Sequence, residues 1–227
     1  MNTIRPLTAE FLGTFALVFI GCGAVVVDSH TAGALGLVGI ALAHALVLSV
    51  MVTATMNISG AHINPAVTFA LWLTKKIDTR MGAMYIVAQL AAAVLAALLV
   101  RWLFPSAAGD VTGYGVPRIS GTVTGLEAVA VEALLTFFLV SAVYGTAVSP
   151  EAPKVGGFGI GLVLLFDILA GGPLTGAAMN PARAFGPALI AQEWHGHFVY
   201  WAGPLVGGAL AAGLWGGILL PRESKAG

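Results

Sequence analysis

The chain has 227 residues, of which 58% are hydrophobic and 9% are charged, and its mean hydropathy is +0.94. A water-soluble domain of this size cannot bury so much apolar surface, so the composition indicates a polytopic helical membrane protein. The formal net charge is zero, which offers no electrostatic basis for binding nucleic acid or for steering a highly charged partner.

Apolar runs along the chain predict its organisation. A membrane-spanning helix needs about 20 apolar residues, and two further stretches, 65–73 and 181–191, are too short to cross a bilayer alone. We therefore expect an all-α membrane protein, a single domain over residues 1–227 with six transmembrane helices and two re-entrant half-helices. The expected spans lie near 7–27, 34–54, 82–103, 123–147, 156–174 and 197–220.

Glycines at a spacing of four favour close packing between these spans. The pairs are Gly157 with Gly161, Gly203 with Gly207, and Gly213 with Gly217.

Both short stretches begin with Asn-Pro-Ala. The two copies, 116 residues apart, are Asn64-Pro65-Ala66 and Asn180-Pro181-Ala182. Asn is a favoured helix N-cap, and Pro at the first helical position loses only an N–H that would be unpaired in any case. One such pair is a common turn signal. Two in matching contexts predict two half-helices, each starting at an Asn.

The two halves of the chain resemble each other beyond these copies. AEFLGTFALV at 9–18 aligns with VEALLTFFLV at 131–140 and shares Glu, Leu, Thr, Phe, Leu and Val in register. We expect internal repeats at approximately 5–103 and 123–220. Because each repeat has an odd number of spans, the second enters the membrane in the opposite sense, about a pseudo-two-fold axis in the membrane plane. The half-helices then meet near the midplane, N-terminus to N-terminus.

One glutamate of each repeat lies within an expected span, Glu10 in the first and Glu132 in the second. Non-helical backbone at membrane depth is stable only where it lines a cavity or is buried in protein, and its N–H groups need acceptors. We interpret both carboxylates as braces for the loops that precede the Asn-Pro-Ala copies. A proton-relay role is the alternative, because intramembrane acids often mark transport pathways.

Positive charge is distributed unevenly over the expected loops. Arg101 and Arg118 lie on one side of the membrane, and the side shared by both termini carries more basic residues. By the positive-inside rule, both termini are cytoplasmic, and we expect a location in the plasma membrane. The basic residues on the terminal side are Arg5, Lys75, Lys76, Arg80, Lys154, Arg222 and Lys225.

The meeting point of two helix N-termini has a defined chemistry. Their positive dipole ends and free N–H groups, with the side-chain amides of Asn64 and Asn180, favour a water molecule that accepts hydrogen bonds through its oxygen. Its hydrogens then point away, which opposes a continuous proton wire, and the positive field repels cations. The arrangement predicts a pathway for small neutral solutes.

The motifs are similar to those of one family along nearly the whole chain. SGAHINPAVTFA, GAAMNPARAFGPAL and HGHFVYWAGPLVGG, with the paired glutamates, resemble the aquaporins of the major intrinsic protein family. In that family, the positive ends of half-helix dipoles are known to exclude protons and cations. The resemblance implies a homotetramer in which each protomer has its own pore for water and small neutral solutes. It implies neither a cofactor nor an enzymatic activity.

In this family, four positions outside the midplane form a constriction that filters solutes. Matched by spacing, they are His44, Ile168, Ala177 and Arg183. An arginine in an apolar half-helix is costly unless it lines water, and it adds a barrier to cations. The family's strict water channels carry an aromatic residue, His, a small residue and Arg. The set found here resembles that of plant tonoplast intrinsic proteins, several of which pass ammonia as well as water.

The chain also departs from these patterns. Members of the tonoplast subfamily can carry a filter-facing His in the loop between the third and fourth spans, but residues 104–122 contain none. Whether Arg118 of this loop contributes to the filter is left open by the sequence. Glycerol facilitators typically carry Asp where this chain has Ala184, and a Pro-aliphatic pair in place of Tyr200-Trp201, so we do not expect glycerol conduction.

Asp167 and Cys22 belong to none of the motifs or filter positions named above. Asp167 lies about 100° round a helix from Ile168 and should face away from the pore. A structural hydrogen bond to a neighbouring helix or subunit is the favoured interpretation, and a protonation-dependent gate is the alternative. The lone Cys22 should pack as a small hydrophobe.

Two other classes of function fit the sequence less well. A coupled secondary transporter also uses inverted repeats, but it needs coupling carboxylates on the substrate route. An enzyme needs a nucleophile–base pair or a metal cluster, and His62, His195 and His197 are each isolated and more typical of structural or solvated residues. A passive channel is the interpretation that the motifs favour.

Overall fold

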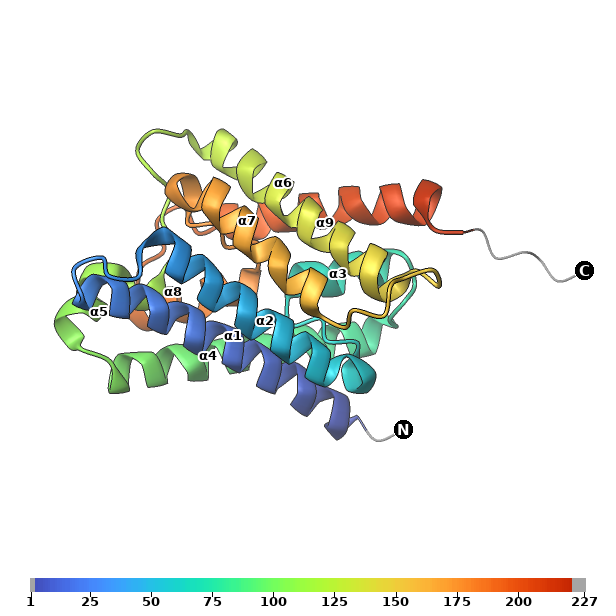
Figure 1. Cartoon of the computed structure of the whole chain (residues 1–227), viewed down its shortest axis with the longest axis horizontal. Coiled ribbons are helices and arrows are strands. Elements are labelled where there is room, and N and C mark those ends of the chain that lie inside the picture. The colour runs from blue at the N-terminus through green and yellow to red at the C-terminus, as the bar shows by residue number, and fades with distance from the viewer. Residues whose placement is uncertain (1–2, 222–227) are drawn as a thin grey trace, which may run out of the picture.

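The computed structural model describes residues 3–221 and is a bundle of helices (Figure 1). Six of the described helices are long and apolar enough to cross a membrane, which confirms the predicted fold class. They are α1 (Ile4–His30), α2 (Gly36–Ser59), α4 (Thr79–Leu103), α6 (Gly125–Val143) continued by η2 (Tyr144–Val148), α7 (Phe158–Thr175), and α9 (Val199–Leu214) continued by η3 (Trp215–Leu219).

Two half-helices start at the Asn-Pro-Ala copies, α3 (Pro65–Leu73) and α8 (Pro181–Ala191). Their bounds equal the two short apolar stretches of the sequence. The Asn64 side chain accepts a hydrogen bond from the Ala66 N–H at 2.8 Å, and the Asn180 side chain accepts one from the Ala182 N–H at 3.0 Å. Each helix therefore starts where an Asn cap and a Pro at the first position stop the chain from being helical any earlier.

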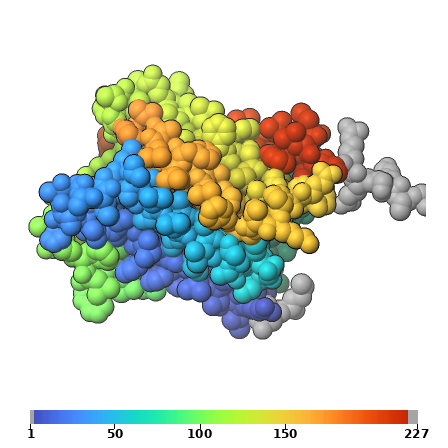
Figure 2. Space-filling model, viewed as in Figure 1, coloured from blue at the N-terminus to red at the C-terminus, as the bar shows by residue number. Residues whose placement is uncertain are grey.

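The half-helices join the two halves of the chain. They enter from opposite ends of the bundle (Figure 1). α3 packs against α9 as well as α4, and α8 packs against α4, so each half-helix contacts a spanning helix of the other half. The halves also meet where α2 packs against α7, side by side on the face shown in Figure 2.

Glycines allow the closest helix crossings. A Cβ at Gly161 of α7 would overlap Ser49 of α2, and a Cβ at Gly207 of α9 would overlap the Ala133 carbonyl of α6. For Gly213 and Gly217, no heavy atom of the described residues outside the adjoining helix backbone lies within 4 Å of such a Cβ. Two of the three glycine pairs thus lie at crossings, and the third does not.

The segment between α4 and α6 contains structure that the sequence does not predict. It forms a short helix, α5 (Ser106–Thr112), and a 3₁₀ turn, η1 (Gly113–Gly115), both packed against α1. Tyr114 adopts the left-handed region with φ of 52°. A helix of seven small and polar residues has no apolar periodicity, so hydrophobic patterning carries no signal for it.

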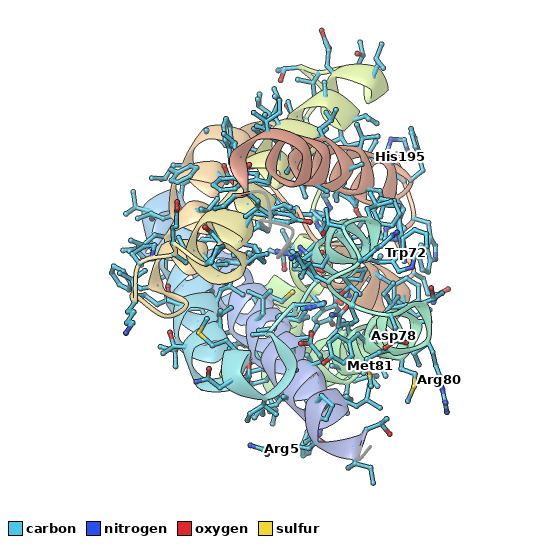
Figure 3. The ribbon with its side chains drawn as sticks, turned by 90° about the vertical axis from the view of Figure 1, so that its right-hand side faces the viewer. Arg5, Trp72, Asp78, Arg80, Met81 and His195 are labelled. Carbon is cyan, nitrogen blue, oxygen red and sulfur yellow. The ribbon has the colours of Figure 1, made fainter. Side chains whose placement is uncertain are left out.

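The start of α1 and the end of η3 lie at the same end of the bundle (Figure 1). Seen from that end, Arg5 and Arg80 point outward (Figure 3). Arg101 lies in the last turn of α4, at the opposite end. Of the basic residues expected on the terminal side, Arg222 and Lys225 lie outside the described residues.

Candidate pore and selectivity filter

Three cavities follow one another through the bundle, and each neighbouring pair shares lining residues. The central one has a volume of about 20 Å³ available to the centres of water molecules, and wider ones of about 420 and 260 Å³ adjoin its two ends. The central cavity shares His62 with the first of these and His44 with the second. The central cavity is therefore much the most confined of the three.

At the middle of this pathway the two Asn side chains cross-link the loops. Asn64 Nδ2 donates to the Met179 carbonyl at 2.8 Å, and Asn180 Nδ2 donates to the Ile63 carbonyl at 2.9 Å. Both Asn residues line the central cavity. Since an amide nitrogen carries two hydrogens, one remains on each Asn for a solute. The sequence indicated free donors, and half of each donor group is in fact used to hold the opposite loop.

The loops before the half-helices have matching strained backbones. Ala61 and Ile63 in the first, and Ala177 and Met179 in the second, all have φ between 44° and 56°. The left-handed region costs a residue other than glycine roughly 1–2 kcal/mol. Such segments persist only where surrounding contacts fix them.

In the first loop those contacts come from Glu10. Its Oε1 accepts hydrogen bonds from Ser59 Oγ at 2.6 Å and the His62 N–H at 2.9 Å. Its Oε2 accepts from the Ile63 N–H at 2.7 Å and from Gln89 Nε2 at 2.9 Å. The carboxylate is fully buried and has four donors.

Glu132 makes the corresponding contacts in the second loop. Its Oε1 accepts from Thr175 Oγ1 at 2.7 Å and the Ala178 N–H at 2.9 Å, and its Oε2 accepts from the Met179 N–H at 2.7 Å. Neither Glu132 nor Glu10 lines any of the three cavities. This placement suits a brace better than a relay on the solute route.

The four residues matched to the filter lie together at one end of the narrow cavity. Ala177 lines the central cavity, while His44, Ile168 and Arg183 line both it and the wider cavity beyond. Arg183 Nη1 donates to the Gly115 carbonyl at 2.6 Å, and Nη2 lies 3.5 Å from His44 Nε2.

The tautomer of His44 follows from its two contacts. His44 Nδ1 lies 2.9 Å from the Ile40 carbonyl, which can only accept, so Nδ1 carries the proton. Nε2 faces the Arg183 guanidinium, which can only donate, so Nε2 is a bare acceptor. His44 and Arg183 therefore place a neutral imidazole beside a fixed positive charge at this end of the narrow cavity.

Sequence reasoning missed two glycines that make room for the side chains at this end of the cavity. A Cβ at Gly21 of α1 would overlap the His44 ring. A Cβ at Gly115 would lie 2.7 Å from Cys22 Cβ, and Cys22 Sγ lies 3.9 Å from the Gly115 carbonyl. Cys22 is fully buried. Nothing in the sequence distinguishes these two glycines among the 30 of the chain.

Two further side chains differ in their relation to the pathway. His62, which the sequence suggested was isolated, lines the central cavity and one wider cavity, with Nδ1 3.1 Å from Thr68 Oγ1. Asp167 is 1% exposed and lines none of the three cavities. Its Oδ2 has no hydrogen-bond partner among the residues described.

Comparison with known proteins bears directly on this arrangement. The family model described as Major intrinsic protein matches residues 1–215. The chain belongs to the major intrinsic protein family. It is an aquaporin, an integral membrane channel and not an enzyme, as its motifs predicted.

Curated aquaporins of plants are similar along nearly their whole length. Aquaporin TIP4-4 of Zea mays is 45% identical over 227 residues, covering 96% of this chain and 88% of that protein. Probable aquaporin TIP3-2 of Arabidopsis thaliana is 43% identical and covers 99% of this chain and 87% of the relative. Both names support the resemblance to the tonoplast intrinsic proteins.

A solved structure supports the aquaporin fold. The aquaglyceroporin from Plasmodium falciparum superposes with a TM-score of 0.82 at 25% identity, covering 96% of this chain and 97% of that one.

Proposed function

We propose that this aquaporin is a passive pore for water and ammonia that excludes protons, ions and glycerol. The proposal is based on the position of Ile168, which lies with His44 and Arg183 where the narrow cavity opens. An apolar side chain there, in place of the His of strict water channels, leaves fewer fixed hydrogen-bonding groups in the constriction. The permeability to ammonia, a small neutral solute, is then higher relative to that of water.

Exclusion of charged species is assigned to the middle of the pore and to Arg183. The N-termini of α3 and α8 direct positive dipole ends at the pathway, and Asn64 and Asn180 supply donors but no acceptor to a passing water. Arg183 adds a full positive charge at the constriction. Glu10 and Glu132 act as braces that hold the loops in place, and their position away from the solute route argues against proton coupling.

Exclusion of glycerol rests on two positions. The solved relative is named an aquaglyceroporin, but this chain has Ala184 where glycerol facilitators carry Asp, and Tyr200-Trp201 where they carry a Pro-aliphatic pair. Tyr200 is buried and donates to the Thr175 carbonyl at 2.8 Å, which ties α9 to the end of α7.

The assembly and location are part of the proposal. We assign a homotetramer with one pore per protomer, and cytoplasmic termini by the positive-inside rule. The sequence favoured the plasma membrane. The subfamily name of the plant relatives favours a tonoplast instead, and a fluorescent fusion in the native cell distinguishes the two.

The ammonia claim is tested in proteoliposomes loaded with a pH-sensitive dye. An ammonia gradient should alkalinise the lumen faster than in protein-free liposomes, and Ile168→His should slow this uptake while water permeability persists. Lys154→Gln, a change in an exposed loop, serves as the control. Ammonia uptake at the rate of protein-free liposomes, from protein that conducts water, would restrict the channel to water.

A further inference from the structure

We propose that Arg118 and Glu193 form a positioning clamp that sets the selectivity of the filter. The clamp holds the loop that carries the Gly115 carbonyl, the acceptor for Arg183. The proposal rests on the proposed function, because it concerns how the Arg183 filter discriminates among neutral solutes.

The pair has two-point geometry. Arg118 Nε donates to Glu193 Oε1 at 2.7 Å, and Nη2 donates to Oε2 at 2.8 Å. The remaining terminal nitrogen, Nη1, donates to the Val111 carbonyl at 2.7 Å. A planar fork of this kind fixes orientation as well as distance, which a lysine could not do.

The pair joins two segments that already meet at the filter. Glu193 lies just beyond α8, and its N–H donates to the Ala188 carbonyl at 3.0 Å, so it moves with the outer end of that half-helix. Arg183 lies in the first turn of the same half-helix and contacts Gly115. The 115–118 segment is thus held to α8 at two points, by Arg183 at one end and by Glu193 at the other.

The segment is also packed tightly against its neighbours. A Cβ at Gly113 would lie 2.7 Å from Glu193 Oε2, and a Cβ at Gly176 would lie 2.9 Å from Pro117 Cβ. Gly176 directly precedes the filter residue Ala177. A shift of Arg118 is therefore transmitted to the Gly115 carbonyl on one side and to the loop of Ala177 on the other.

Position and charge fit this role. Arg118 lines the wider cavity outside the filter, together with His44 and Arg183. Its hydrogen bonds to Glu193 hold the pKa of that carboxyl below its ordinary value, and the neighbouring His195 adds to this lowering. Both members of the clamp are therefore charged at neutral pH.

Breaking the clamp should alter selectivity more than water flux. The Gly115 carbonyl would lose its anchorage, and Arg183 would no longer be held at one position across the constriction. Larger neutral solutes would then pass more readily. Water would still cross the middle of the pore, because the Asn64 and Asn180 contacts do not involve this loop.

The experiment measures osmotic water permeability and glycerol permeability of proteoliposomes for the wild type, Glu193→Gln and Arg118→Gln. The glycerol-to-water ratio should rise roughly two- to fivefold in both variants, the factor that corresponds to losing up to about 1 kcal/mol from a partly exposed pair. Arg118→Lys keeps the charge without the fork and should give an intermediate ratio.

Glu127→Gln is the matched control. It removes an exposed carboxylate at the start of α6 that contacts Thr124 and not the 115–118 segment. An unchanged ratio in Glu193→Gln and Arg118→Gln, with normal water flux, would overturn the clamp and leave the proposed function intact. Water flux at the level of protein-free liposomes in the wild type would instead overturn the proposed function itself.

Discussion

At the scale of single residues, backbone carbonyls hold the two polar side chains of the proposed filter. The Ile40 carbonyl fixes the His44 ring, and the Gly115 carbonyl fixes the Arg183 guanidinium. Both carbonyls can only accept, so each holds a donor N–H of its partner in one orientation. The constriction is therefore preorganised before any solute arrives.

Replacing His44 should widen this constriction. His44→Ala removes a buried ring beside Arg183, and we expect the permeability to urea and glycerol to rise relative to that of water. Leu46→Ala, at a 52% exposed position of the same helix, is the control. Solute permeabilities in proteoliposomes give the comparison, and an unchanged ratio in His44→Ala would argue against a pore-lining role.

Substitution of Asp167 distinguishes a structural role of this side chain from a role as a pH-dependent gate. Because it is buried away from the three cavities, we expect Asp167→Asn to leave water permeability unchanged between about pH 5 and pH 8. Its effect should appear in assembly or thermal stability, read by size-exclusion chromatography and a melting curve. A pH-dependent permeability in the wild type that disappears in Asp167→Asn would support the gate.

The Arg118–Glu193 contact should also respond to acid. The pKa of Glu193 is lowered from 4.5 chiefly by its hydrogen bond to Arg118, with His195 contributing. A lowered pKa in the folded state means that the contact stabilises the protein above the ordinary value and is lost as pH falls through the lowered one. The glycerol-to-water ratio should stay constant from about pH 7 to pH 5 and rise only in more acidic buffer. A rise near pH 6 would contradict this assignment.

At the scale of elements, close crossings and braced loops position the site. α6 and α9 approach through Gly203 and Gly207, and a Cβ at Gly203 would lie 2.5 Å from Glu132 Cβ. Packing of α9 and placement of the second brace are therefore coupled. The first repeat has the equivalent brace in Glu10, with one further donor from Gln89 of α4.

This coupling predicts contrasting effects of the same substitution on one helix. Gly207→Ala should destabilise the protein by about 1–3 kcal/mol, because its Cβ would overlap the Ala133 carbonyl. Gly213→Ala, whose Cβ would meet no described residue outside the adjoining helix backbone within 4 Å, should be neutral or stabilising by about 0.5–1 kcal/mol. Thermal unfolding in detergent compares them, and equal melting temperatures would contradict the assigned crossing.

The elements were largely predictable and their contacts were only partly so. Length and hydropathy identify the spans, and the Asn-Pro-Ala copies locate α3 and α8 at their observed first residues. The spacing from Asn64 and Asn180 also predicted four filter positions. The structure brings these residues together around one cavity, and their role as a filter stays a prediction. The role of the Gly115 carbonyl could not be predicted, because every residue has a carbonyl. Only the tertiary position of its loop makes this one an acceptor for Arg183. The same holds for Gly21, which matters through a space and not through a side chain.

At the scale of the whole molecule, one narrow pathway passes between two similar halves. Its middle is held by contacts that run from each loop to the other, Asn64 to Met179 and Asn180 to Ile63. Neither half could form this centre alone, and each half-helix packs on a spanning helix of the other half. A confined route lined by the positive charge of Arg183 suits passive flow that requires no rocking of one half against the other.

The most direct test of this account is stopped-flow shrinkage of proteoliposomes under an impermeant osmolyte, measured over a range of temperatures. We expect shrinkage much faster than that of protein-free liposomes, with a low activation energy, because water crosses a preformed pore. Shrinkage at the rate of the lipid alone, from protein shown to be folded, would contradict the assignment of an open water pore.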